Sequence, residues 1–282
     1  MKISSKNIEF QFNRPIVMGI VNITPDSFYD GGVYNRYEDA LKRVANMIKN
    51  GADIIDIGGE STRPGASTIS LQEELDRVMP IIEAVNKRFD ILVSVDTSKA
   101  LVMQEAARAG AHIINDIRSL HELGALEAAA KTGLAVCIMH MLGEPKTMQQ
   151  APVYKNVVLE VKQYLSDEIV RCQMAGITKN RLIIDPGFGF GKTLAHNYQL
   201  LAKLSDFHTL GVPLLVGISR KSMIGQLLNI PIEERLIGSI ACAVIAAMNG
   251  AKIIRSHDVR EAVQAMKIAQ EALLVKENDD YE

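Results

Sequence analysis

The chain alternates short apolar runs with longer segments in which apolar residues recur every third or fourth position. Continuous runs rich in β-branched residues are typical of parallel strands that are buried on both faces of a sheet. The spacing of three to four predicts amphipathic helices with one buried face. The alternation occurs eight times, and the predicted strands begin at residues 16, 53, 91, 112, 135, 181, 213 and 252.

The helical segments carry recognisable start and stop signals. Segment 37–48 keeps its apolar residues on one face and is followed by Gly51, a common helix terminator. The helix after the second strand begins with Ser70 and Glu73, which have the spacing of a capping box. Pro80 inside this helix predicts a kink.

Eight strand-then-helix units without a linker predict one (β/α)8 TIM barrel, an α/β fold that spans residues 1–282 as a single domain. Segment 1–15 precedes the first unit and predicts a short N-terminal β-hairpin. A doubly wound open sheet is the alternative fold. Such a sheet ordinarily carries a glycine fingerprint after its first strand, which this sequence lacks.

Composition narrows the functional classes. Of the 282 residues, 48% are hydrophobic and 23% are charged, which is typical of a folded globular enzyme. The formal net charge of −2 and the absence of like-charge runs argue against a nucleic-acid partner. The N-terminus does not resemble a signal peptide, and the longest apolar run, near residues 240–248, falls short of the ~20 residues that span a membrane. Three scattered cysteines fit a reducing compartment, so we expect a cytoplasmic protein without a membrane partner.

The stretch LIIDPGFGFGKT, residues 182–193, resembles a phosphate-binding P-loop. A P-loop requires a glycine five residues before the glycine of its Gly-Lys pair. That position, five before Gly191, is Pro186. Asp185 would also place a carboxylate beside the phosphates, so we reject a nucleotide triphosphatase.

Polar residues follow every predicted strand. In a barrel the carboxyl ends of the strands converge on the face where catalysis takes place, so together these residues predict an active site. They are Asn22, Asp26, Glu60, Thr62, Asp96, Ser98, Asn115, Asp116, His140, Asp185, Ser219, Lys221, Arg255, His257 and Asp258.

Asp96, Asn115 and Asp185 suit a heterocycle with adjacent N–H donors. A carboxylate accepts two such donors in a bidentate manner, and an amide adds a mixed donor and acceptor contact. A single Asp at a strand end also commonly caps a helix or forms an Asx-turn. The glycines of the 187–191 turn allow the backbone to approach a flat ligand, and Phe188 or Phe190 is placed to stack on it.

Arg255 and His257 alternate at the last strand, so they are expected to point the same way and to bind an anion. The alternatives are a surface ion pair and a core histidine whose hydrogen bonds are satisfied within the protein. Asn22 ends the first strand, which neighbours the last one in a barrel, and is the candidate ligand that brings Mg²⁺ to the same phosphates. Lys221 follows its strand closely enough to contact the ligand, whereas Arg220 is expected to begin a solvated helix.

The sequence offers neither a Ser-His-Asp triad nor histidine pairs of zinc-hydrolase spacing. What remains is an anion pocket, a heterocycle pocket and a Mg²⁺ ligand without a nucleophile. This set favours a transferase that positions two small substrates and stabilises a diphosphate leaving group.

Longer motifs follow one another along essentially the whole chain. They are GIVNITPDSFYDGG (19–32), GADIIDIGGESTRPGA (51–66), SVDTSK (94–99), INDIRS (114–119), HMLGEPKTMQ (140–149), DPGFGFGK (185–192), GISRKS (217–222) and RSHD (255–258). Together these motifs closely resemble those of the dihydropteroate synthase family. The resemblance implies a (β/α)8 barrel that condenses 6-hydroxymethyl-7,8-dihydropterin diphosphate with 4-aminobenzoate in folate biosynthesis, by an SN1-like route. It also implies inhibition by sulfonamides, which mimic the aminobenzoate.

The resemblance further implies roles for individual residues. Catalytic roles fall to Asp96, Lys221, Arg255 and His257. The pterin would contact Asp96, Asn115, Met139, Asp185, Phe190, Gly217 and Lys221. The diphosphate would contact Arg255, His257 and, through the metal cofactor Mg²⁺, Asn22. The aminobenzoate would lie among Phe28, Thr62, Pro64, Phe190, Lys221 and Ser222.

Segment 237–250 is apolar nearly all round, although a helix outside a barrel buries only one face. The other face predicts a homodimer.

Two functional alternatives stay open: a pterin-binding methyltransferase module and an inactive pterin-binding subunit. The methyltransferase module transfers no diphosphate, so it has no use for Arg255 and His257. The inactive subunit should have lost some of the residues that bind the anion.

Overall fold

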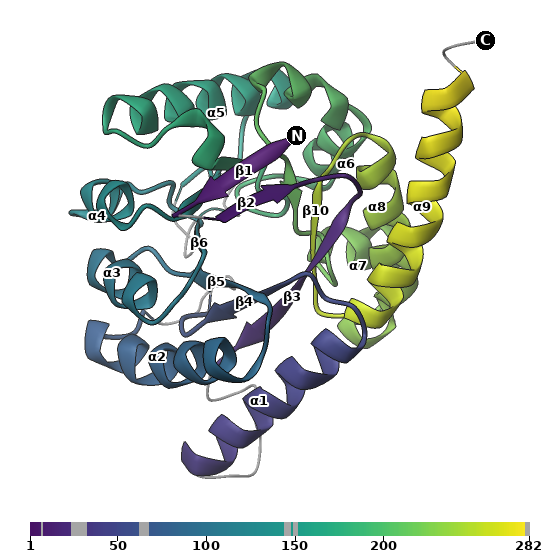
Figure 1. The fold of residues 1–282 in the computed structure, drawn as a ribbon. Helices are drawn as coiled ribbons and strands as arrows, with labels where there is room; N and C mark the ends of the chain where they lie inside the picture. The colour runs from purple at the N-terminus through teal and green to yellow at the C-terminus, as the bar shows by residue number, and fades with distance from the viewer. Residues whose placement is uncertain (7, 24–32, 62–67, 144–147, 149–151, 280–282) are drawn as a thin grey trace.

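The computed structural model describes residues 1–6, 8–23, 33–61, 68–143, 148 and 152–279 (Figure 1). The barrel strands are β3 (Ile16–Asn22), β4 (Ile54–Gly58), β5 (Leu92–Asp96), β6 (Ile113–Asp116), β7 (Ala135–Met139), β8 (Leu182–Asp185), β9 (Leu215–Val216) and β10 (Ile253–Ser256). The α-helices are α1 (Val33–Lys49), α2 (Leu71–Arg88), α3 (Ala100–Arg108), α4 (Ala125–Thr132), α5 (Val157–Met174), α6 (Leu194–Ala202), α7 (Ser222–Leu228), α8 (Leu236–Met248) and α9 (Val259–Asp279). Short 3-10 helices cover Lys179–Arg181, Leu204–Leu210 and Ile232–Glu234.

The eight strands form one parallel sheet in the order β8-β7-β6-β5-β4-β3-β10-β9. An isolated parallel bridge between Ile184 and Leu214 joins β8 to the segment that enters β9, so the sheet closes on itself. Helices surround it (Figure 1). The TIM barrel predicted from the hydrophobic pattern is confirmed, and the open-sheet alternative is wrong.

All eight predicted strands are present, but β9 is only two residues long. Pro213 has no N–H to donate to a neighbouring strand, which delays the start of pairing. Directly before β9, the Leu214 carbonyl accepts hydrogen bonds from the amides of Lys252 and Ile253. The barrel is therefore closed on this side by few strand bonds.

The predicted helix signals are largely confirmed. The Ser70 hydroxyl accepts a hydrogen bond from the Glu73 amide at 3.1 Å, which caps α2. α2 then continues through Pro80 to Arg88. In the described parts of the chain, no helix has both the length and the apolar character that crossing a bilayer requires.

The N-terminal hairpin closes the end of the barrel opposite the predicted site. Strands β1 (Lys2–Ser5) and β2 (Ile8–Gln11) pair antiparallel and lie across the barrel in Figure 1. Ile3 and Phe12 pack against apolar side chains that point into the barrel, which are Met18, Ile54, Ile113, Ala135, Cys137, Ile183, Leu215 and Ile253. The predicted hairpin is thus confirmed, and it fills the floor of the barrel.

Candidate active site

The strand register aligns the first site residues in a row. Asn22 pairs with Gly58, Gly58 with Asp96, and Asp96 with Asn115. Gly58 keeps this row close-packed, because a methyl group built on it would lie 3.3 Å from Asp96 Cβ and 3.7 Å from Asn22 Oδ1. The carboxyl-end rule therefore placed Asn22, Asp96 and Asn115 correctly at one level of the barrel mouth.

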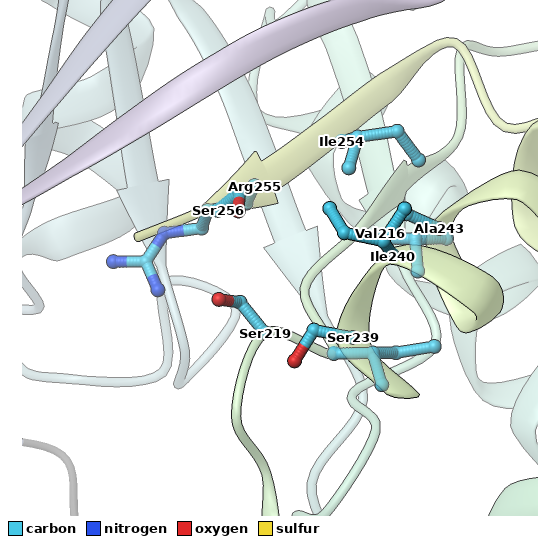
Figure 2. A pocket seen from close by; sticks show the side chains of 9 residues that line it. Val216, Ser219, Ser239, Ile240, Ala243, Ile254, Arg255 and Ser256 are labelled. Atoms are coloured by element: carbon cyan, nitrogen blue, oxygen red, sulfur yellow. The ribbon is translucent and has the colours of Figure 1, made fainter. Parts of the chain in front are cut away.

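Arg255 lies between two carboxylates. Its Nε donates to Asp56 Oδ2 and its Nη2 donates to Asp96 Oδ2, each at 2.7 Å. Asn115 Nδ2 also donates to Asp56 Oδ2, at 3.1 Å. Figure 2 shows the Arg255 side chain leaving the apolar residues around Ile254 and extending away from them. An anion must therefore compete with Asp96 for this guanidinium.

Burial shifts the ionisation of this cluster. Burial raises the pKa of Asp96 to about 7; Arg255 opposes the shift, while Asp56 adds to it. Burial alone would lower the pKa of Arg255, but Asp56 and Asp96 together raise it above its usual value. Arg255 is consequently charged, whereas Asp96 changes charge near neutral pH.

Asp185 and Lys221 form the other side of the mouth. Asp185 ends β8 and accepts a hydrogen bond from the Gly187 amide at 2.7 Å, so it also forms the Asx-turn that was the alternative reading. Burial raises the pKa of Asp185 and lowers that of Lys221 to about 8, and their mutual attraction opposes both shifts. Lys221 Nζ lies 4.6 Å from the ring centroid of Phe190, a cation–π contact.

Of the two phenylalanines proposed to stack on a ligand, only Phe190 lies at the site. Phe188 is completely buried in the core between strands and helices, so of the two alternatives Phe190 is the one available to a ligand. Phe190 instead packs with Met139 and Met148 in a small apolar cluster. The sequence could not separate the two because a glycine-rich turn has no regular side-chain period.

Lys192, the lysine of the P-loop-like stretch, supports that same turn. Its Nζ is 2.9 Å from the Gly187 carbonyl, 3.0 Å from the Phe190 carbonyl and 2.9 Å from His140 Nδ1. Burial, and secondarily Lys192, lower the pKa of His140 to about 3, so His140 is neutral. The side chain is buried in protein contacts, which agrees with the rejection of a P-loop.

His257 and Arg255 have different partners. The His257 amide and Nδ1 each lie 3.1 Å from Ser219 Oγ, which orients the ring beside the end of β9. Ser219 and Arg255 line a small pocket between β9, β10 and α8 (Figure 2). Arg220, expected in solvent, instead makes a two-bond ion pair with Asp258 at 2.8 and 2.9 Å.

Comparison with known proteins decides the family. A family described as "Pterin binding enzyme" matches residues 18–257. The dihydropteroate synthase of Escherichia coli (strain K12) is 60% identical over 282 residues, which is 100% of both chains. This chain belongs to the dihydropteroate synthase family. It is therefore an enzyme, a transferase.

Solved structures of dihydropteroate synthases agree with this assignment. The Yersinia pestis enzyme with a sulfonamide drug superposes with a TM-score of 0.92 at 60% identity, covering 96% of this chain and 99% of that one. The Xanthomonas albilineans enzyme with 4-aminobenzoic acid superposes with a TM-score of 0.91 at 46% identity, covering 96% and 98%.

The remaining dihydropteroate synthase positions are placed only in part. Phe28, Thr62 and Pro64 lie outside the described residues. Ser222 is exposed at the start of α7. A methyl group built on Gly217 would lie 3.7 Å from Arg255 Cβ, so Gly217 adjoins the stem of that arginine.

Glu60 belongs to a cluster of three charged side chains near the carboxyl end of β4. Lys99 Nζ donates to Glu60 Oε2 and to Glu74 Oε2, and Glu74 is itself buried in α2. These contacts fix Glu60, two residues after the end of β4.

Metal binding was predicted at Asn22. Among the residues that the structure describes, no group of three or more His, Cys, Asp or Glu side chains could hold a metal ion. Mg²⁺ bound to substrate phosphates needs only one or two protein ligands. The Asn22 amide oxygen, level with Asp96 at the mouth, has the chemistry for such a ligand.

Sequence reasoning missed two residues of this dihydropteroate synthase site, Asp56 and Lys192. It named Ser219 at the end of its strand, but not as the partner of His257. Asp56 carried a signal, because a charged residue inside the apolar run Ile54–Gly58 is unusual unless it is paired. Once the P-loop had been rejected, nothing in the sequence indicated a role for Lys192.

Proposed function

We propose that this chain catalyses the dihydropteroate synthase reaction with the residues described above. The reaction joins the methylene carbon of 6-hydroxymethyl-7,8-dihydropterin diphosphate to the amine of 4-aminobenzoate and releases diphosphate. The observation that carries the assignment is the full-length identity of 60% with the E. coli enzyme, together with polar residues at the matching strand ends. The chain would act as one domain over residues 1–282.

The pterin would bind between the two halves of the mouth. Asp96 and Asp185 are acceptors for its N–H edges, and the Asn115 amide contributes a further polar contact. Phe190 and Met139 offer apolar surface to the ring, and both are buried at the mouth. Lys221 lies beside Phe190 and would contact the ring's polar rim.

Arg255 and His257 would bind the diphosphate and stabilise its charge as the C–O bond breaks. Asn22 would hold Mg²⁺, which would supply positive charge to the leaving diphosphate. Bond breaking would precede attack, with the cation delocalised over the pterin ring and stabilised by the Asp96 carboxylate. The aminobenzoate amine would then attack the methylene carbon and lose its proton to solvent.

The test is a product assay with purified protein, the pterin diphosphate and 4-aminobenzoate, with and without Mg²⁺. Equimolar, Mg²⁺-dependent formation of dihydropteroate and diphosphate is expected, and a sulfonamide should compete with 4-aminobenzoate. Tight pterin binding without product would favour the inactive pterin-binding subunit. Methyl transfer in place of condensation would favour the methyltransferase module.

Asp96 makes pterin affinity dependent on pH. Because its pKa is about 7 in the folded protein and 3.8 in the unfolded reference, its contribution to stability is complete below about pH 4 and is lost as pH rises through 7. The pterin needs the ionised carboxylate. Affinity for 6-hydroxymethyl-7,8-dihydropterin is therefore expected to rise about tenfold from pH 6 to pH 8. Calorimetry at both pH values measures it, and Asp96→Asn should make the profile nearly flat; an unchanged profile in that variant would contradict the prediction.

We further propose a homodimer formed through α8. Ile237 is 82% exposed and Ile245 is 45% exposed on the helix face that turns away from the barrel. Exposed apolar side chains gathered on one face mark an interaction surface. Ile237→Lys is expected to convert a dimer into a monomer in light scattering at micromolar concentration. Met174→Lys, at an equally exposed position on α5, should leave the mass unchanged. A monomeric wild-type chain would refute the proposal.

We also propose a cytoplasmic location. Cys137, Cys172 and Cys242 are buried free thiols, which supports a reducing compartment.

A further inference from the structure

Asp56 is a charged residue inside the barrel that the proposed reaction does not use. It lies two residues before Gly58 on β4, so both face the same side of the sheet. Its side chain is completely buried. Its Oδ2 accepts from Arg255 Nε at 2.7 Å and from Asn115 Nδ2 at 3.1 Å. Asp56 therefore joins a diphosphate residue on β10 to a pterin residue on β6.

The Arg255–Asp96 contact stands in the way of both parts of the substrate. Asp96 cannot give its carboxylate fully to pterin N–H donors while Arg255 Nη2 occupies Oδ2 at 2.7 Å. Arg255 likewise cannot turn Nη2 to a phosphate oxygen while Asp96 holds it. Each group thus gives part of its charge and hydrogen-bonding capacity to the other, and full contacts with the substrate require this ion pair to be exchanged.

The Arg255–Asp56 contact uses a different nitrogen and need not break. Nε, on the stem side of the guanidinium, donates to Asp56, whereas Nη2 is at the outer end. Asp56 lies deeper in the barrel than Asp96, because Asp96 pairs with Gly58 in the sheet register. A guanidinium held at Nε can turn its outer nitrogens toward an anion without leaving the mouth.

We propose that Asp56 is a positioning residue that holds Arg255 through Nε while the Arg255–Asp96 contact is exchanged for contacts with the substrate. Pterin takes over Asp96, and the released end of Arg255 takes the diphosphate. Occupation of either subsite then favours occupation of the other. This inference rests on the proposed function and adds to it the coupling between the two halves of the substrate.

The experiment measures the affinity of the full chain for inorganic pyrophosphate with Mg²⁺ by calorimetry, with and without saturating 6-hydroxymethylpterin, which cannot react. In the wild type, the pterin is expected to raise pyrophosphate affinity at least tenfold. By linkage, pyrophosphate should raise pterin affinity by the same factor.

Two variants separate the roles of the carboxylates. Asp96→Asn frees Arg255 in advance, so its pyrophosphate affinity without pterin should equal that of the pterin-bound wild type. Asp56→Asn removes the negative charge that holds Nε, so pyrophosphate should bind at least tenfold more weakly with and without pterin, with a raised KM for the pterin diphosphate and a lowered kcat. Asp53→Asn is the matched control, because Asp53 pairs with Arg14 at the opposite end of the barrel. It should change neither affinity nor kcat. Urea unfolding establishes that each variant is folded.

Pyrophosphate affinity that is independent of pterin, in a wild type that forms product, would overturn the exchange. So would an Asp96→Asn variant that binds pyrophosphate more weakly than the wild type, or an Asp56→Asn variant that behaves like Asp53→Asn. Failure of the proposed function has a different signature, namely that the wild type forms no dihydropteroate, whether or not it binds pterin.

Discussion

Arg255→Ala is expected to lower kcat/KM by about 10²- to 10³-fold, the range for removing one group that stabilises a developing charge. The expected loss is large because Arg255 is the cation nearest both Asp56 and Asp96 and would carry much of the charge of the departing diphosphate. Steady-state kinetics with varied pterin diphosphate measure it, and an unchanged kcat/KM would remove Arg255 from the reaction.

The same variant should be less stable, with a characteristic pH dependence. Removing one partner of a buried ion pair costs about 3–5 kcal/mol. Without Arg255 the pKa of Asp96 rises further, so the carboxyl becomes neutral and the loss is smaller at pH 6 than at pH 8. Urea unfolding at the two pH values gives the difference. Arg14→Ala, which removes a more exposed partner of Asp53, should cost only about 1 kcal/mol or less and leave kcat/KM unchanged.

Gly187→Ala is expected to disturb both the fold and the site. Gly187 has φ +71°, and a methyl group built on it would lie 1.8 Å from the His140 carbonyl oxygen. The left-handed backbone alone costs about 1 kcal/mol with alanine, and overpacking adds about 1–3 kcal/mol. The turn must shift, and it carries the amide bound by Asp185 and the Phe190 carbonyl bound by Lys192. We expect at least an approximately 10²-fold fall in kcat/KM, the effect of a misplacement of about 1 Å.

Gly176→Ala distinguishes the free-energy cost of the left-handed backbone from the cost of the steric contact. Gly176 has φ +90° but nothing within 4 Å of the added methyl group. In urea unfolding, this variant should lose only about 1 kcal/mol of stability, the cost of the left-handed backbone, and it should keep full activity. Equal effects at the two positions would show that the contact with His140 is unimportant.

The sequence was most informative where physical constraints act locally. Parallel strands buried on both faces require continuous apolar runs, so all eight were visible, and the barrel rule then placed Asp96, Asn115 and Asp185 at one mouth. β9 was the least regular of them, because Pro213 cannot enter a strand ladder in the way the other residues do.

Pairing between distant residues was invisible in the sequence. Arg255 and Asp56 are 199 residues apart, and neither residue indicates the other. The pattern predicted where Arg255 stands but not that a carboxylate already holds it. Phe188 and Phe190 could not be distinguished because their directions depend on the three-dimensional course of the glycine-rich turn, which Lys192 fixes from within.

The closure of the barrel has a consequence for its biogenesis. β3, the first barrel strand to be synthesised, pairs with β10, the last, and the hairpin residues Ile3 and Phe12 share a core with Ile253. A nascent chain that has not reached Ile253 therefore exposes an unpaired edge of β3 and an incomplete floor. Such edges invite pairing between chains. The enzyme is thus expected to complete its fold only after nearly all of it has left the ribosome, with chaperones protecting the open sheet until then.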